Sequence, residues 1–228
     1  MFKLICRMLS ISKVNLYRES VIGAGRQEGI MKDSDFVPKI WPEDQVPSGA
    51  LKYYNQCEVC TEKSRMIWGE GNPNAPILII LDNPGERVDK EGREYVCGTR
   101  QTLQGAIHRV GLDAHDFYLT YLLKCRPLKK YDKERAREFS KPFLFGQIET
   151  IDPKFIVCLG DVVIQTVFDD KETSVKSLRG VWRSIAGHPC LVSYHPLAVR
   201  RRPNLMGVFM EDWRMLADRF LSENQKPV

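Results

Sequence analysis

The sequence predicts an α/β fold, a three-layer α/β/α sandwich built around a central parallel sheet. Short, continuous apolar runs such as residues 77–81 and 155–159 are typical of strands that are buried on both faces. Stretches with a helical spacing of apolar residues lie between these runs. Strands that alternate with helices need crossover connections, and such connections produce a parallel sheet covered by helices on both sides.

The strands are predicted where apolar runs stop at turn-forming residues. The sharpest stop is the sequence Asp-Asn-Pro-Gly at residues 82–85, which ends the first run. Two short runs in the C-terminal third flank a Gly-His-Pro turn. The predicted strands span residues 77–81, 117–123, 155–159, 182–185 and 190–194.

The helices are predicted from apolar residues that recur at helical spacing between the strands. Gly111 is a natural stop for one of them, and Asp161 is placed to cap the N-terminus of another. The predicted helices span residues 49–63, 102–110, 133–150, 161–168 and 206–221.

Length and composition limit the class of protein. The 228 residues suit one domain, and an apolar fraction of 43% excludes a disordered chain. No run approaches the roughly 18 apolar residues that a membrane helix needs, so we expect no membrane partner. Lys and Arg exceed Asp and Glu by 34 − 29 = 5, a mild basic excess that permits a polyanionic partner without requiring one.

The 7 cysteines indicate the cellular compartment. An odd number counts against a complete disulfide framework, and no secretory signal begins the chain. We therefore expect a cytoplasmic protein with reduced thiols. In that compartment a Cys-x-x-Cys pair indicates metal or redox chemistry.

The N-terminal part differs from the rest. Residues 1–30 lack helical or strand periodicity, and codons for the Gln-Glu-Gly before Met31 can contain a bacterial ribosome-binding signal. We expect translation to start at Met31, the alternative being a natural floppy tail. Residues 1–48 are therefore interpreted as an extension, and residues 49–228 as one domain.

Three polar, proline-containing motifs follow predicted strands or close them. They are residues 82–85, 124–127 and 195–196. Ligands of parallel α/β sheets bind beyond the carboxyl ends of the strands, where these motifs should gather. This edge is the predicted functional site.

An ordered series of motifs runs along the chain, at residues 69–76, 83–86, 124–127, 178–180 and 194–196. Their order and spacing resemble those of the family 4 (iron–sulfur) uracil-DNA glycosylases over about residues 57–220. The resemblance implies the α/β/α sandwich of that superfamily. It also implies a monofunctional hydrolase that cuts the bond between uracil, or another deaminated base, and deoxyribose in DNA, as the first step of base excision repair.

The resemblance assigns catalytic roles to three residues. Cleavage of a glycosidic bond develops positive charge on the sugar and negative charge on the leaving base. His195 would donate a hydrogen bond to the base, Asp82 would place negative charge near the sugar, and Asn83 would orient water. The alternatives are a structural histidine and a simple Asp-Asn-Pro-Gly turn.

The resemblance places Tyr95, Gly85 and Tyr121 in the base pocket. Tyr95 would stack on the extruded base. Tyr121 stands where family members carry the Asn that is implied to read the uracil edge by paired hydrogen bonds. A phenol offers only one hydroxyl, and a site built on such bonds loses discrimination when they are removed. Hypoxanthine is therefore the nearest rival to uracil.

Three cysteines match three of the four cluster ligands of the family. They are Cys57, Cys60 and Cys125, while Ser140 stands at the fourth position. The resemblance implies a 4Fe-4S cluster, held by three thiolates and a serine oxygen or water. A zinc ion or an empty site are the alternatives.

A basic segment follows the His-Pro motif. Arg200, Arg201 and Arg202 are expected to bind phosphates, and Val199 and Arg200 align with leucines that wedge into DNA in the family. The predicted partner is DNA, single-stranded or duplex with an extruded base, bound by a monomer. The rival functions are an inactive nucleic-acid-binding protein of the same fold and a redox or zinc protein.

Overall fold

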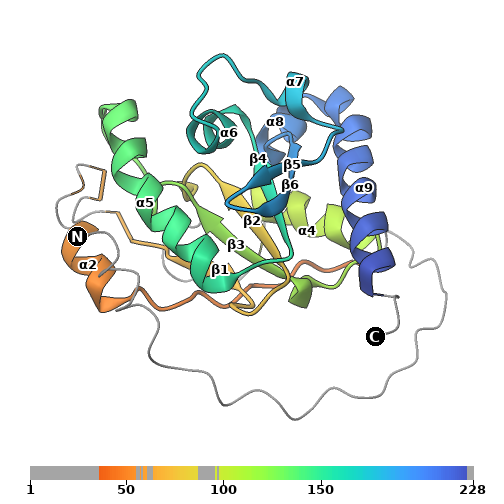
Figure 1. Cartoon of the computed structure of the whole chain (residues 1–228), viewed down its shortest axis with the longest axis horizontal. Coiled ribbons are helices and arrows are strands. Elements are labelled where there is room, and N and C mark those ends of the chain that lie inside the picture. The colour runs from red at the N-terminus through yellow and green to blue at the C-terminus, as the bar shows by residue number, and fades with distance from the viewer. Residues whose placement is uncertain are drawn as a thin grey trace, which may run out of the picture.

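The computed structural model describes residues 36–54, 57, 59–60, 64–86, 96 and 98–224. The predicted start at Met31 and the predicted stacking residue Tyr95 lie outside the described residues. A central sheet is covered on one side by α4 and α9 and on the other by α5 and α6 (Figure 1). The expected three-layer architecture is thus confirmed.

The sheet has six strands in the order β1-β3-β2-β4-β6-β5. The four central strands β3, β2, β4 and β6 run parallel, and the two edge strands are antiparallel to their neighbours. The sheet is therefore mixed, with the predicted parallel part at its centre. Its strands are β1 (Gly69–Gly71), β2 (Ile77–Leu81), β3 (Phe117–Tyr121), β4 (Phe155–Leu159), β5 (Arg183–Ile185) and β6 (His188–Ser193).

The helices occupy the predicted segments with shifted ends. In the described residues, the helix predicted over 49–63 ends at Tyr54, and the one predicted over 161–168 is capped by Gly160. Asp161 is not a cap: its carboxylate accepts the N–H of Val175 at 2.7 Å and so fixes the start of α7. The helices are α2 (Ser48–Tyr54), α4 (Thr99–Arg109), α5 (Lys133–Ile151), α6 (Asp161–Val167), α7 (Val175–Leu178), α8 (Pro196–Arg201) and α9 (Met206–Asn224), with short 3-10 turns at Ala114–Asp116 and Pro203–Leu205.

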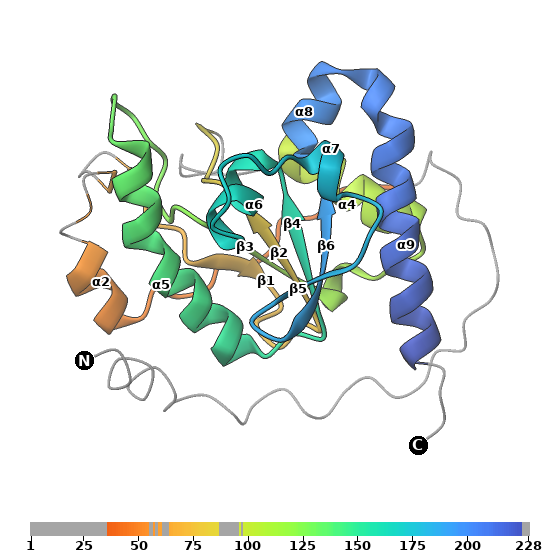
Figure 2. The same ribbon diagram turned by 45° about the horizontal axis from the view of Figure 1, so that its top comes forward.

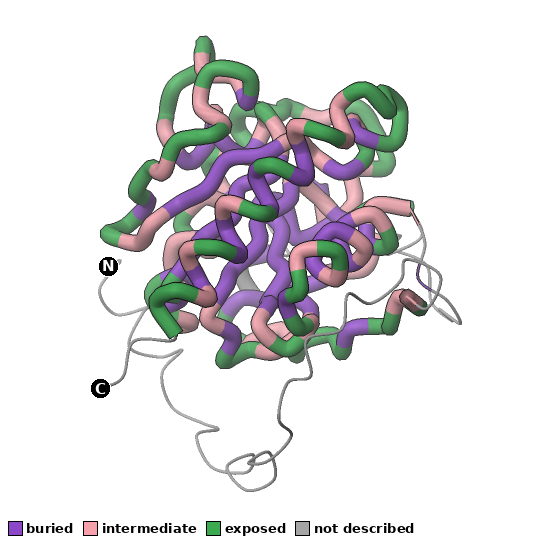
Figure 3. The backbone as a smooth tube through the Cα atoms, turned by 90° about the vertical axis from the view of Figure 1, so that its right-hand side faces the viewer, coloured by how far each residue is buried: buried purple, intermediate pink, exposed green. Residues whose placement is uncertain are grey.

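Alternate residues of the central strands fill two cores. Along β2, Ile77, Ile79 and Leu81 face the core beneath α4 and α9, whereas Leu78 and Ile80 face the core beneath α5 and α6. Strands β2, β3 and β4 are buried along their length, whereas edge strand β5 and the outer faces of the helices are exposed in part (Figure 3). Burial on both faces explains why these strands read as unbroken apolar runs.

Residues 36–48 are part of the folded unit, although the sequence suggested an extension up to residue 48. The indole of Trp41 lies in the larger core. Asp44 accepts a hydrogen bond from the phenol of Tyr118 at 3.0 Å, and Lys39 exchanges two backbone hydrogen bonds with the side chain of Gln104. The folded unit therefore begins before the expected boundary at Gly49. No helix among the described residues is long and apolar enough to cross a membrane.

We expect Gly69→Ala to destabilise the fold. A Cβ atom at residue 69 would overlap the phenol of Tyr118, which is buried and hydrogen-bonded to Asp44. Overpacking of this kind costs about 1–3 kcal/mol of unfolding free energy, measurable by urea denaturation. Gly49→Ala is the matched control, because nothing lies within 4 Å of its Cβ position in α2. Equal stability of the two variants would contradict the prediction.

Candidate active site

The carboxyl edge of the parallel strands brings the predicted motifs together. The segments after β2 and β3 are joined by backbone hydrogen bonds from Leu122 to Leu81 and from Leu123 to Asp82, both of 2.8 Å. The end of β6 is joined to β4 by a bond from the N–H of Gly160 to the carbonyl of Ser193. Helix α8 stands at this edge, directly after β6 (Figure 2).

His195 is held at the N-terminus of α8 in a defined orientation. It is the N-cap residue, and its Nδ1 accepts the backbone N–H of Leu197 at 3.0 Å. A ring nitrogen that accepts a hydrogen bond carries no proton, so the neutral imidazole has its proton on Nε2. Nε2 lies 3.4 Å from Oδ1 of Asp82. The structure thus joins two residues that are far apart in the sequence.

Gly160 provides the space in which His195 sits. Its φ angle of 97° belongs to the region that side chains rarely adopt, and a Cβ atom there would lie 3.1 Å from Cβ of His195. The turn between β4 and α6 therefore needs glycine for two reasons, backbone conformation and close approach. Gly160 directly follows the strand predicted over residues 155–159, but the sequence alone gives no sign of its approach to His195.

Asp82 and Asn83 form the turn that the sequence indicated, and this turn also presents polar groups to His195. Burial opposes ionisation of Asp82, but its hydrogen bond and attraction to His195 and the backbone N–H of Asn83 together lower its pKa below the ordinary value. Its side chain remains a carboxylate at neutral pH. The amide nitrogen of Asn83 donates to the carbonyl of Pro84 at 2.9 Å.

The predicted pocket residues occupy different environments. Gly85 is exposed, with nothing within 4 Å of its Cβ position. Tyr121 is 1% exposed, and its phenol donates to Glu70 at 2.9 Å. Glu70 in turn forms an ion pair with Arg100. Sequence reasoning missed Glu70 and Arg100, because a lone charge in a strand or helix carries no sign of burial.

The basic segment divides into an exposed and a buried part. Arg200, Arg201 and Arg202 are exposed at the end of α8, at the edge where His195 lies. Val199 is 1% exposed and packs in the larger core, so it does not have the wedge position that the alignment suggested. The exposed apolar residue of this helix is Leu197.

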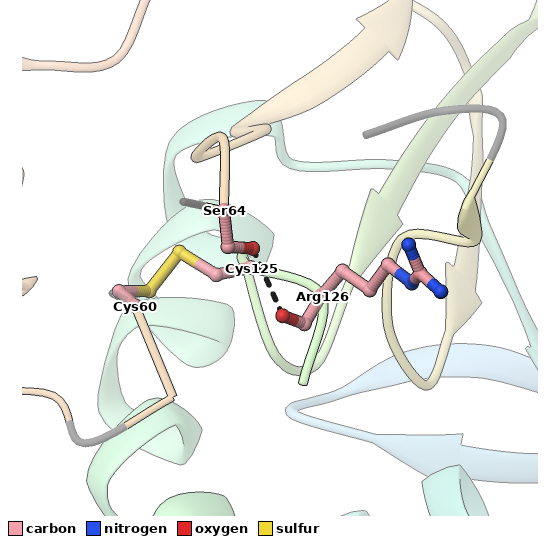
Figure 4. The surroundings of a disulfide bond; sticks show 4 residues. All are labelled: Cys60, Ser64, Cys125 and Arg126. Carbon is pink, nitrogen blue, oxygen red and sulfur yellow. Dashed lines mark hydrogen bonds between the residues drawn. A yellow bond between two sulfur atoms is a disulfide. The ribbon is translucent and has the colours of Figure 1, made fainter. Parts of the chain in front are cut away.

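The three candidate metal ligands gather in one apolar cluster. Cys57, Cys60 and Cys125 pack together between α2 and α5, and Ser140 is fully buried on α5. Cys60 and Cys125 form a disulfide, and Ser64 beside them donates to the carbonyl of Arg126 at 2.9 Å (Figure 4). The expectation of reduced thiols is therefore wrong for this pair. Cys57 is a buried free thiol.

This donor set does not fit a 4Fe-4S cluster. Two of the three thiols are bonded to each other, and the fourth position offers a hydroxyl instead of a thiol. Among the described residues, no group of three or more His, Cys, Asp or Glu side chains could hold a metal ion. A zinc ion also needs three or four such ligands, so the described residues do not fit the zinc alternative either.

Comparisons with known proteins identify the family. Residues 68–217 match the model of the uracil DNA glycosylase superfamily. The Type-4 uracil-DNA glycosylase of Saccharolobus solfataricus is 33% identical over 178 residues, which cover 74% of this chain and 82% of that protein. The enzyme of the same name from Sulfurisphaera tokodaii is 31% identical over 72% of this chain and 78% of its own length. A DNA polymerase of Bacillus phage SP01 is 27% identical over 70% of this chain, but the match covers only 17% of that protein. Fold, motif order and these relatives together show that the chain belongs to the uracil DNA glycosylase superfamily.

Proposed function

We propose that this chain hydrolyses the N-glycosidic bond between uracil and deoxyribose in DNA, leaving an abasic site for base excision repair. The observation that carries the proposal is the His195–Asp82 pair, with 3.4 Å between Nε2 and Oδ1, at the carboxyl edge of the sheet. Relatives that cover most of the chain are named Type-4 uracil-DNA glycosylases. The proposed enzyme works as a monomer in the cytoplasm, a compartment that reduces disulfides such as Cys60–Cys125.

His195 would stabilise the leaving base. The target nucleotide must leave the duplex stack before its sugar carbon can react. Because Nδ1 of His195 accepts from Leu197, Nε2 carries the proton, which faces Asp82 in this structure. With DNA bound, His195 would turn this proton from Asp82 to the base oxygen that gains negative charge. A donor aimed at such developing charge lowers the barrier by about 3–4 kcal/mol.

Asp82 and Asn83 would act on the sugar side. The lowered pKa keeps Asp82 ionised, and a carboxylate stabilises the oxocarbenium-like sugar. The amide of Asn83 orients water without acting as a base, which suffices when departure of the base leads the reaction. The nucleophile is water, so no covalent enzyme–DNA intermediate is part of the proposal.

Arg200, Arg201 and Arg202 would bind the DNA backbone beside the reacting nucleotide. They are exposed at the end of α8, the helix that His195 caps. Contacts of arginine with phosphate dominate affinity and make it depend on salt. The substrate is a single strand, or a duplex from which the base is extruded. The cluster implied by the resemblance is left out of this mechanism, because the donor set does not fit it.

We expect His195→Ala to lower kcat on a single-stranded, uracil-containing oligonucleotide by about 100- to 1,000-fold, because the donor to the base is lost. The measurement is strand cleavage after alkali. Circular dichroism checks that the variant folds. Salt-dependent binding by a wild-type protein that cleaves neither uracil nor hypoxanthine would instead support the inactive nucleic-acid-binding protein.

Gly160→Ala tests the placement of His195 without removing it. A Cβ atom 3.1 Å from that of His195 would force this residue to move by a few tenths of an ångström, so we expect kcat to fall by less than the 100-fold that a displacement of about 1 Å can cost. Gly111→Ala is the matched control, since Gly111 also has a positive φ, of 72°, but nothing within 4 Å of its Cβ position. Equal losses of kcat in the two variants would show that backbone strain alone is responsible.

Ser140→Cys should create the missing fourth thiol. We expect this variant, reduced and given iron and sulfide without oxygen, to gain the broad absorbance near 400 nm of an iron–sulfur cluster, and the wild type to gain much less. Total iron per chain is the second readout. Uptake of about four irons by the wild type would contradict the prediction.

A further inference from the structure

A buried charged group lies beside the sheet edge that carries the proposed active site, and it takes no part in the mechanism above. It consists of Tyr121 at the end of β3, Glu70 in β1 and Arg100 in the first turn of α4. Glu70 is 0% exposed and Arg100 is 9% exposed. A carboxylate in the interior is tolerated when it is paired and hydrogen-bonded, and both oxygens of Glu70 are engaged here.

The phenol of Tyr121 is held in one orientation. Burial, with the neighbouring charge of Glu70, raises the pKa of Tyr121 well above its ordinary value, so the hydroxyl keeps its proton. That proton is donated to Oε1 of Glu70, while Arg100 pairs with Oε2. The backbone of Tyr121 is fixed as well, because the residue is part of the parallel ladder with β2.

The group reaches the edge at which the reaction would take place. Tyr121 pairs with Leu81, the residue before Asp82. Arg100 belongs to the turn that starts at Gly98, and a Cβ atom on Gly98 would lie 3.1 Å from a guanidinium nitrogen of Arg200. Residue 121 is thus located close to the catalytic pair, with its hydroxyl turned to Glu70.

We propose that Tyr121, held by Glu70 and Arg100, forms no hydrogen bond with the base. Residue 121 therefore does not take part in base selection in this site. Residue 121 then gives uracil no advantage over hypoxanthine, another deaminated base with a lactam group, so the substrate class includes both. This inference rests on the proposed function. The C1′–N bond breaks with its electron pair moving to the base, the oxygen of water bonds to C1′, and the base gains one proton of that water.

The first experiment compares kcat/KM for uracil and for hypoxanthine in otherwise identical single strands. Tyr121→Asn supplies an amide that pairs with the uracil edge, so the uracil-to-hypoxanthine ratio should rise at least about tenfold over the wild type. Tyr121→Phe removes only the hydroxyl and should leave the ratio unchanged while lowering stability. A ratio that changes as much in Tyr121→Phe as in Tyr121→Asn overturns the inference, because the phenol then reads the base.

Tyr118→Phe is the matched control for stability. Tyr118 lies on the same strand, is equally buried, and donates its phenol proton to Asp44 on the opposite side of the sheet. Its loss should lower the melting temperature as Tyr121→Phe does, without effect on the ratio. A purely structural role for Tyr121 predicts that even Tyr121→Asn leaves the ratio unchanged, and that outcome also overturns the inference.

A binding measurement separates this inference from the proposed function. Oligonucleotides with fluorine at C2′ of the uracil or hypoxanthine nucleotide resist hydrolysis and report affinity alone. The inference is supported if the wild type binds the uracil and the hypoxanthine oligonucleotide with similar affinity and Tyr121→Asn prefers uracil. This holds even if the wild type cleaves neither oligonucleotide. A strong uracil preference of the wild type that disappears in Tyr121→Phe overturns it, whatever the cleavage result.

Discussion

Parallel pairing of β2, β4 and β6 is the constraint on which the site depends. It brings the end of β2, with Asp82, and the end of β6, with His195, to one edge although β4 lies between them. The imidazole must therefore cross the end of β4 to reach the carboxylate. Gly160, the first residue after β4, leaves that path open because it has no side chain. The geometry of the proposed catalytic pair and the backbone conformation after β4 thus depend on the same turn.

The sequence predicted the parts of the fold that follow from local patterns. Unbroken apolar runs located the strands, because burial on both faces leaves no room for polar alternation. The contacts that depend on distant partners were not predictable. In the sequence Glu70 is typical of an exposed charge, and only the fold shows its contacts with Arg100 and Tyr121. Val199 was likewise expected at the surface, but α8 packs it into the larger core. Cys57, Cys60 and Cys125 were expected together as reduced metal ligands; they lie together, but Cys60 and Cys125 form a disulfide.

The Lys-Cys-Arg-Pro motif shows how a polar signature can serve the interior. Lys124 is fully buried, and burial holds its pKa well below the ordinary value, which favours the neutral amine. It contacts the hydroxyl of Thr120 at 2.6 Å and the side-chain oxygen of Gln147. These hydrogen bonds satisfy the amine in the interior, where an unpaired polar group is costly. The next residue, Cys125, is tied to Cys60, so the motif joins the sheet to the segment after α2.

The segment before α2 covers a sheet edge at which copies of this protein could otherwise associate. Strand β1 is an outer strand of the sheet, and such strands offer free backbone groups to neighbouring molecules. Here the backbone of Asp44 donates to Gly69 and that of Gly71 donates to Pro42, both at 2.9 Å. Through these bonds the segment around residues 42–44 covers the edge of the sheet. A fragment that begins at Gly49 would uncover a ready template for strand-to-strand aggregation.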